Sequence, residues 1–238
     1  MSSTLLRPLA LMFGYDLRTV RRSDSVDLHL QRYFKHHRTD LLIDVGAHVG
    51  AFGQMCRKIG YGGPILSFEP ASVGFATLKK AADADGKWQA QRMGLGIERA
   101  RLGLNINAGA NFNSLLPSKG TMIDRFPALR TTAVEEVEID RLDAVLDRLG
   151  VKEDAAVFLK SDTQGNDLNV LRGLGPRFGQ VKALMLEMSV QPIYDGAPSH
   201  WELGAFVHAA GFEAYGFSTV SRDMSGGMIE YVALFKRN

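Results

Sequence analysis

The sequence predicts an α/β protein built on a doubly wound, mostly parallel sheet. Short apolar runs typical of buried strands alternate with helical stretches along most of the chain. Glycines or acidic residues follow several of these runs, where the parallel strands of such a sheet would end. The 238 residues, 45% of them hydrophobic, suffice for one domain with a sizeable core. We therefore expect an N-terminal helical extension over residues 1–39 and a sheet domain over residues 40–238.

The first half of the chain reads as successive strand and helix units followed by a more polar segment. Apolar runs of four to six residues are too short for helices and favour buried strands. We expect strands at 41–45, 65–70 and 88–93, helices at 51–59 and 72–84, and short antiparallel strands with loops over 94–132. This order is typical of parallel strands joined by helices.

Regular alternation resumes in the second half. We expect strands at 134–139, 155–160, 181–186, 212–217 and 228–235, and helices at 141–149, 167–174 and 201–210. The last two strands follow each other without a helix, so they form a pair at one side of the sheet.

The N-terminal extension contains one apolar segment, residues 5–12, which Arg7 and Pro8 interrupt. We expect a helix or arm that packs on the domain or on a second subunit of a homodimer. The alternative is a helix on a membrane surface, because arginines flank the leucines. No apolar run approaches the roughly 18 to 20 residues that cross a bilayer, so stable membrane insertion is not expected.

Charge and cysteine content exclude several classes of protein. The 28 Lys and Arg residues are nearly balanced by 26 Asp and Glu residues, which argues against a nucleic-acid partner. The single cysteine, Cys56, excludes an internal disulfide framework and reads as a buried structural thiol. A cytoplasmic protein is expected.

Four acidic residues stand at the predicted carboxyl ends of strands: Asp44, Glu69, Asp162 and Glu187. Glu69 follows Asp44 by 25 residues, about one β-α-β step, which places it on the strand beside the turn after Asp44. A carboxylate at that position can accept hydrogen bonds from both hydroxyls of a ribose.

The turn at residues 46–50 indicates which nucleoside cofactor is bound. The dinucleotide motif G-x-G-x-x-G, started at Gly46, requires glycine where this chain has His48 and Ala51. Asp44 would also repel a pyrophosphate, whereas it would attract an amine or a sulfonium. The turn therefore points to S-adenosylmethionine. The alternative is a tight strand-to-helix turn with two surface acids.

Four segments resemble the FkbM-type S-adenosylmethionine-dependent methyltransferases. They are D-V-G-A-H-V-G at 44–50, F-E-P at 68–70, N-F-N-S-L at 111–115 and K-S-D-T-Q-G-N-D at 160–167. His48, the spacing of Asn113 and Ser114, and Asp167 depart from the usual pattern. The resemblance implies a Rossmann-like, seven-stranded class I methyltransferase sheet with an antiparallel last strand. It implies cofactor contacts from these motifs: Asp44, Gly46, Ala47, His48, Gly50, Glu69 and Pro70.

The resemblance also implies a hydroxylated acceptor. Members of the family methylate hydroxyls of sugars, polyketides or glycolipids, and S-D-T-Q at 161–164 differs from the N/D-P-P-Y/F/W motif of amino-directed enzymes. We expect O-methylation of a sugar or short oligosaccharide. The alternatives are a polyketide, lipid or other secondary metabolite as acceptor, or a non-catalytic module that binds an adenosyl ligand.

Asp162 is the candidate general base, because it directly follows an apolar strand and an alcohol must lose its proton on methylation. The alternative is a helix cap. Glu187 ends the next strand and would orient the acceptor. By resemblance to related sugar methyltransferases, Asp162 and Glu187 could instead hold Mg²⁺, which would activate the hydroxyl.

Four further residues are candidates for binding the acceptor: Gln164, Tyr194, His200 and Trp201. Gln164 follows Asp162, and Tyr194 lies in the loop after Glu187, where specificity usually resides. His200 and Trp201 would roof the acceptor, since an aromatic ring can stack on the apolar face of a sugar. An ordinary helix start with a core Trp is the alternative.

Overall fold

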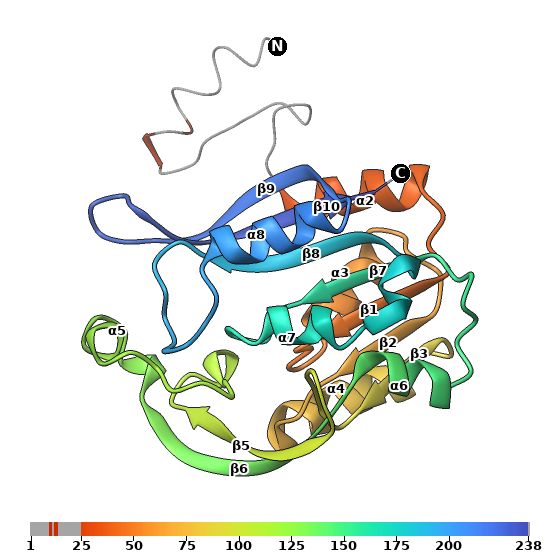
Figure 1. Ribbon diagram of the computed structural model, residues 1–238. Coiled ribbons are helices and arrows are strands. Elements are labelled where there is room, and N and C mark those ends of the chain that lie inside the picture. The colour runs from red at the N-terminus through yellow and green to blue at the C-terminus, as the bar shows by residue number, and fades with distance from the viewer. Residues whose placement is uncertain (1–9, 11, 14–24, 238) are drawn as a thin grey trace.

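The protein is represented by a computed structural model that describes residues 10, 12–13 and 25–237 (Figure 1). Its main sheet has seven strands in the order β3-β2-β1-β7-β8-β10-β9. Their bounds are Leu41–Val45 for β1, Ile65–Phe68 for β2, Trp88–Gln91 for β3, Val157–Ser161 for β7, Val181–Ser189 for β8, Glu213–Arg222 for β9 and Met228–Lys236 for β10. Neighbouring strands are parallel, except that β10 is antiparallel to β8 and β9. The predicted doubly wound α/β sheet with an antiparallel last strand is confirmed.

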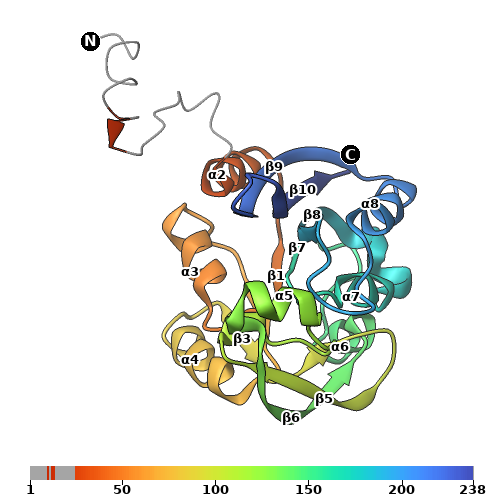
Figure 2. The ribbon, with the colours of Figure 1, turned by 90° about the vertical axis from the view of Figure 1, so that its left-hand side faces the viewer.

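Helices cover both faces of the main sheet (Figure 2). One layer consists of α2 (Val26–His36), α3 (Ala51–Lys58) and α4 (Ser72–Asp83), and the other of α6 (Leu142–Arg148), α7 (Asp167–Arg172) and α8 (His200–Ala209). Alternate residues of one strand point to opposite faces, so Leu42 packs with the first layer and Ile43 with the second. Because both faces are covered, β1, β2 and β7 are buried along their whole length.

The strand expected at 134–139 does not belong to the main sheet. It is the middle of β6 (Thr131–Asp140), which pairs with β5 (Ala100–Asn107) and β4 (Gly94–Leu95) in a separate three-stranded sheet. Its first half is exposed, and in its second half the exposed Glu136 and Glu138 alternate with the buried Val137 and Ile139, a pattern that fits an antiparallel ribbon and not a buried parallel strand. Between β5 and β6 lie the short helix α5 (Gly120–Arg125) and the 3₁₀ turns η2 (Ala110–Phe112) and η3 (Pro127–Leu129). The turn η4 (Gly175–Gln180) precedes β8.

The small sheet and its connections lie beside one edge of the main sheet. Figure 2, which turns the left-hand side of Figure 1 to the viewer, shows α5 in front of the main strands. Val45 pairs with Phe68 on β2 and with Ser161 on β7, so these three carboxyl ends lie level with one another. The polar residues that follow them are thereby gathered at one edge, which the β5–β6 connection covers.

The N-terminal extension is described only in part. The segment expected at 5–12 lies outside the described residues, apart from Ala10 and Met12. Helix α2 packs on the main sheet, where the buried side chains of Leu30 and Tyr33 join the same core cluster as Phe158. Within the described part of the chain, no helix is both long and apolar enough to cross a membrane.

We predict that α2 contributes to the stability of the sheet domain. Leu30 is fully buried, so Leu30→Ala should lower the free energy of unfolding by about 2–5 kcal/mol. Leu102→Ala is the control, because Leu102 is 44% exposed on β5 and its loss should change stability by no more than about 0.5 kcal/mol. Chemical denaturation measures both variants. Equal, small effects would show that α2 is not part of the cooperative core.

Candidate functional site

A cavity of about 430 Å³ opens at the carboxyl ends of β1, β2 and β7. This is the edge of a doubly wound sheet where ligands bind, and the volume is that of a small-molecule site. Its walls come from the turn after β1, from α3, from the residues after β2, β3 and β7, and from the β5–β6 connection. The site residues predicted from the sequence that line it are Gly46, Ala47, His48, Glu69, Pro70, Asp162 and Gln164.

The turn after β1 needs glycine because it approaches β7 closely. Gly46 has a positive φ of 71°, and a Cβ on it would lie 1.9 Å from the backbone oxygen of Asp162. The amides of Gly46 and Ala47 both donate to the carbonyl of Phe68, at 3.0 and 2.9 Å. Gly50, with φ of 86°, then begins α3. The turn is thereby fixed between β2 and β7 with its backbone toward the cavity.

Glu69 is held by the backbone of two turns. Its Oε2 accepts from the amide of His48 at 2.7 Å, and its Oε1 accepts from the amide of Ala71 at 2.9 Å. Burial raises the pKa of Glu69, and these two amides oppose the rise. Each carboxylate oxygen carries a second lone pair, so Glu69 can still accept hydrogen bonds from a ligand in the cavity.

Asp44 does not line the cavity, contrary to the direct ligand contact expected from the sequence. It is fully buried, and its Oδ1 lies 3.1 Å from Nζ of Lys160. Burial raises the pKa of Asp44, and Lys160 opposes the rise. For Lys160, burial lowers the pKa, but the carboxylates of Asp44 and Asp162 outweigh it and the net shift is upward. Sequence reasoning missed this partner, because the pairing of Asp44 with Lys160 across β1 and β7 depends on the strand order.

Lys160 also joins the two strand ends. Its ammonium donates to the carbonyl oxygens of Gly46, at 2.9 Å, and Val45, at 3.3 Å. On the cavity side it lies 3.7 Å from Oδ2 of Asp162. Lys160 therefore neutralises the buried Asp44, holds the glycine turn and faces the candidate base.

Asp162 and Glu187 are brought together by Gln164. The side-chain nitrogen of Gln164 donates to Oδ1 of Asp162 and to Oε2 of Glu187, both at 2.8 Å. Oη of Tyr194 donates to Oε1 of Gln164, also at 2.8 Å. Tyr194 is only 2% exposed and, like Glu187, does not line the cavity. Tyr194 thus contacts Gln164 and not the space where an acceptor would lie.

The surroundings of Glu187 favour its protonated form. Burial, followed by the carboxylates of Asp162 and Glu230, raises the pKa of Glu187 to about 10. Glu230 was not predicted as a site residue. It lies buried on β10, with hydroxyls of Ser189 and Ser221 at 3.4 and 3.3 Å. An acid within the otherwise apolar strand 228–235 was the signal that could have identified it.

The arrangement of Asp162 and Glu187 does not fit Mg²⁺. A magnesium site offers free carboxylate oxygens to the metal, whereas here one Gln164 amide donates to both carboxyl groups, the Lys160 ammonium lies 3.7 Å from Oδ2 of Asp162, and Glu187 does not line the cavity. In the part of the chain that the structure describes, no group of three or more His, Cys, Asp or Glu side chains is placed to hold a metal ion. We therefore derive no metal-dependent step.

The roof of the cavity was not predicted. It consists of Leu104, Ala110, Asn111, Asn113 and Leu115, from β5 and the segment that follows it. The hydroxyl of Ser114 donates to the backbone oxygen of Gln164 at 2.7 Å, so the roof is joined to the turn after β7. The N-F-N-S-L segment marked this region in the sequence, but only the fold shows that it faces the glycine turn.

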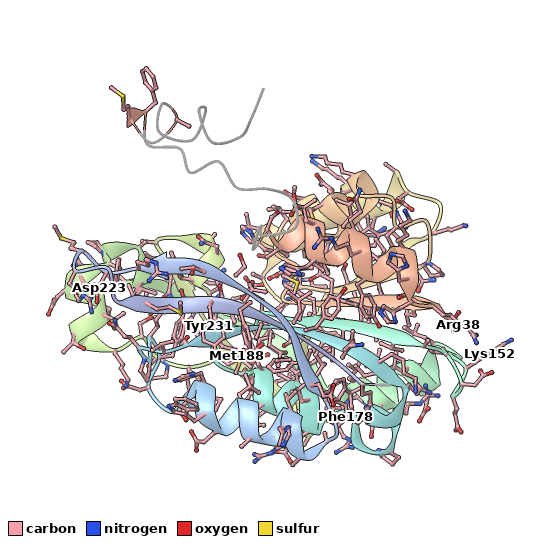
Figure 3. The ribbon with its side chains drawn as sticks, turned by 90° about the horizontal axis from the view of Figure 1, so that it is seen from above. Arg38, Lys152, Phe178, Met188, Asp223 and Tyr231 are labelled. Atoms are coloured by element: carbon pink, nitrogen blue, oxygen red, sulfur yellow. The ribbon has the colours of Figure 1, made fainter. Side chains whose placement is uncertain are left out.

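The structure does not place His200 and Trp201 over the cavity. Nδ1 of His200 lies 3.3 Å from Oη of Tyr231, on β10 (Figure 3), and His200 lines a separate cavity of about 610 Å³ beside β9. The Trp201 side chain is 76% exposed at the start of α8 and is not a core residue either. The predicted helix start is confirmed, because Ser199 and Glu202 form a capping box. A role for these two residues in acceptor binding stays a prediction.

Comparison with known proteins shows the family to which the chain belongs. Residues 44–214 match the family model described as the methyltransferase FkbM domain. The fold is similar to that of methyltransferase FkbM from Methylobacillus flagellatus KT, with a TM-score of 0.54 and 14% identity over 86% of this chain and 47% of that chain. This chain thus spans about half of that relative. Magnesium protoporphyrin IX methyltransferase from Synechocystis PCC 6803, solved with bound SAM, gives a TM-score of 0.48 and 8% identity over 100% of this chain and 92% of that one. No curated protein matches the chain in sequence.

We predict that Gly46→Ala is much more destabilising than the same change at Gly150. Both glycines have positive φ, 71° and 67°, but a Cβ on Gly150 would meet no atom within 4 Å. Gly150→Ala should therefore cost about 1–2 kcal/mol, the penalty of the left-handed backbone alone. Gly46→Ala should lower the free energy of unfolding by about 1–3 kcal/mol more than Gly150→Ala does, because the turn must move away from Asp162. Unfolding free energies measure the difference, and equal values would contradict the close approach.

Proposed function

Because the chain belongs to the FkbM family of S-adenosylmethionine-dependent methyltransferases, we propose that it methylates a hydroxyl group of a sugar or short oligosaccharide. The observation that carries this proposal is Asp162. Its carboxylate ends β7 in the wall of the cavity, and its side chain is 34% exposed, whereas Asp44, Glu69 and Glu187 are buried or lie behind other side chains. It is the acidic group best placed to meet an acceptor.

The cavity fits S-adenosylmethionine. Gly46 and Ala47 bring backbone close to the ligand space, and Glu69 offers carboxylate lone pairs to ribose hydroxyls. Two carboxylates, of Asp44 and Asp162, surround one ammonium, of Lys160, and this excess negative charge favours a sulfonium.

The chain's own residues would carry out three tasks. The turn at Gly46–His48 and Glu69 hold the cofactor, which supplies an electrophilic methyl group when bound. The roof over the cavity excludes water. Asp162 orients the acceptor hydroxyl and takes its proton as that oxygen becomes a nucleophile. Burial and acidic neighbours raise the pKa of Glu187, and Glu187 does not line the cavity, so Asp162 is the better candidate to receive the proton.

The site weighs against one alternative, a non-catalytic module, and leaves the class of acceptor to experiment. A non-catalytic adenosyl-binding module needs no exposed carboxylate beside the ligand, whereas Asp162 is exposed there and held in place by Gln164. The apolar part of the cavity, lined by Phe52, Met55 and Met185, would also accept a polyketide or lipid acceptor. An acceptor screen with labelled cofactor distinguishes these classes. A cytoplasmic location and a homodimer stay predictions.

We predict that Asp162→Asn abolishes methyl transfer while cofactor binding is retained. An amide cannot take the acceptor proton, so the rate should fall by about 10²–10⁴-fold. Calorimetry with S-adenosylhomocysteine should give nearly the wild-type affinity. Asp154→Asn is the matched control, since Asp154 is exposed before the amino end of the same strand.

Two results would contradict the proposal. A near wild-type rate for Asp162→Asn would remove Asp162 from the reaction, and a failure of the wild-type protein to bind either adenosyl ligand would overturn the cofactor assignment.

We predict that removal of divalent metal ions has no effect. The methylation assay in excess EDTA should leave the wild-type rate unchanged, because no step of the proposed reaction depends on a metal.

A further inference from the structure

We propose that Gln164 is a positioning residue that holds Asp162 for proton transfer and that Tyr194 acts only through Gln164. This inference rests on the proposed function, because it names residues that make the same site work. It replaces the acceptor contacts that the sequence suggested for both residues. Four features of the structure carry it: the backbone of Gln164, its bridge between two carboxyl groups, the burial of Tyr194, and the link to the cavity roof.

Gln164 occupies a backbone conformation that few non-glycine residues adopt. Its φ is 54°, and Gly165 follows with φ of 99°. A long side chain in the left-handed region is disfavoured and persists only where surrounding contacts hold it. The hydroxyl of Ser114, which donates to the backbone oxygen of Gln164 at 2.7 Å, is such a contact. The conformation turns the Gln164 side chain back toward Asp162, two residues earlier.

The Gln164 amide makes a hydrogen bond with each of its hydrogens. One goes to Oδ1 of Asp162 and the other to Oε2 of Glu187, both at 2.8 Å. These two acceptor oxygens belong to different strand ends, so the amide fixes Asp162 relative to β8. In the opposite orientation the amide oxygen would face Oδ1 of Asp162, an arrangement that electrostatic repulsion disfavours.

Tyr194 stabilises this orientation of the Gln164 amide through a hydrogen bond to the amide oxygen. Its hydroxyl lies 2.8 Å from Oε1 of Gln164 and 3.0 Å from the carbonyl of Phe112 in the roof segment. With 2% of its surface exposed, Tyr194 is shielded from any acceptor in the cavity. Its effect on the reaction must therefore pass through Gln164. The same two contacts connect the roof with the carboxylate that takes the proton.

The charged and titratable groups around the bridge come from several elements. They are Asp44 on β1, His48 in the turn after β1, Lys160 and Asp162 on and after β7, Asp167 on α7, Glu187 on β8, Tyr194 in the loop after β8, and Glu230 on β10. Gln164 contributes neutral donors among these acids and one ammonium. Removing these donors destabilises ionised carboxylates, so the acid limb of the kcat/KM profile should move to higher pH.

The experiment compares Gln164→Leu, Tyr194→Phe and a matched control, Tyr61→Phe. Tyr61 is a buried tyrosine whose hydroxyl donates to the carbonyl of Pro64 at 3.0 Å, away from the cavity. Gln164→Leu should lower kcat on the order of 100-fold, since a base out of position loses most of its effect. Tyr194→Phe should lower kcat about tenfold, as expected for one supporting hydrogen bond. Tyr61→Phe should leave kcat unchanged.

The split between kcat and KM decides between positioning and acceptor binding. Positioning predicts a lower kcat with the acceptor KM and the S-adenosylhomocysteine affinity nearly unchanged, together with the shifted acid limb. A raised acceptor KM with wild-type kcat would overturn the proposal and restore Gln164 as an acceptor contact. If Gln164→Leu does not fold, Tyr194→Phe, which removes a single oxygen atom, carries the same comparison.

An NMR measurement, which requires no methyl transfer, tests this proposal independently of the proposed function. The side-chain amide of Gln164, seen by ¹⁵N NMR and assigned by its loss in Gln164→Leu, should shift in Tyr194→Phe and not in Tyr61→Phe. An unchanged amide signal in Tyr194→Phe would refute the bridge even if the enzyme methylates a sugar. If no acceptor is methylated, the proposed function fails, while a shifted amide still supports the bridge.

Discussion

The site depends on one interaction, the buried ion pair between Asp44 and Lys160. It joins neighbouring parallel strands at the residues just before their carboxyl ends, and each charge would be costly without the other. Lys160 also donates to the carbonyl oxygens of Val45 and Gly46, so the glycine turn is held against β7. The close approach that requires glycine at position 46 follows from this contact. The ion pair thereby determines where the cavity floor lies.

The acidic residues at this edge have different tasks because their surroundings differ. Asp44 is paired with Lys160, Glu69 is held by two backbone amides, and burial and acidic neighbours raise the pKa of Glu187. Asp162 faces the cavity and receives one hydrogen of the Gln164 amide. Four carboxyl groups of similar intrinsic acidity thus have different surroundings, and under the proposed function Asp44 is structural, Glu69 binds the cofactor and Asp162 takes the proton.

The sequence predicted the main sheet and the cavity walls formed by the turns after β1, β2 and β7, because these depend on local patterns. Apolar runs ending at Asp44, Glu69 and Asp162 identify strands whose ends must meet in a parallel sheet. Sequence-based prediction failed for contacts that depend on which strands are neighbours in the sheet. The partner of Asp44, the place of β6 in a second sheet, and the approach of Ser114 to Gln164 are contacts between distant segments. His200 was expected at the cavity because it comes after β8. The loop after β8 is long, however, and His200 lines a separate cavity beside β9.

A double-mutant cycle on Asp44 and Lys160 tests the central claim most directly. Lys160→Met alone should lower the free energy of unfolding by about 3–5 kcal/mol, because it leaves a carboxylate buried without its partner. Combined with Asp44→Leu, much of that loss should be recovered, giving a coupling energy above about 2 kcal/mol. If the loss in the double variant instead equals the sum of the two single losses to within about 0.5 kcal/mol, Asp44 and Lys160 do not act as a pair. The ion pair would then not be what holds the site together.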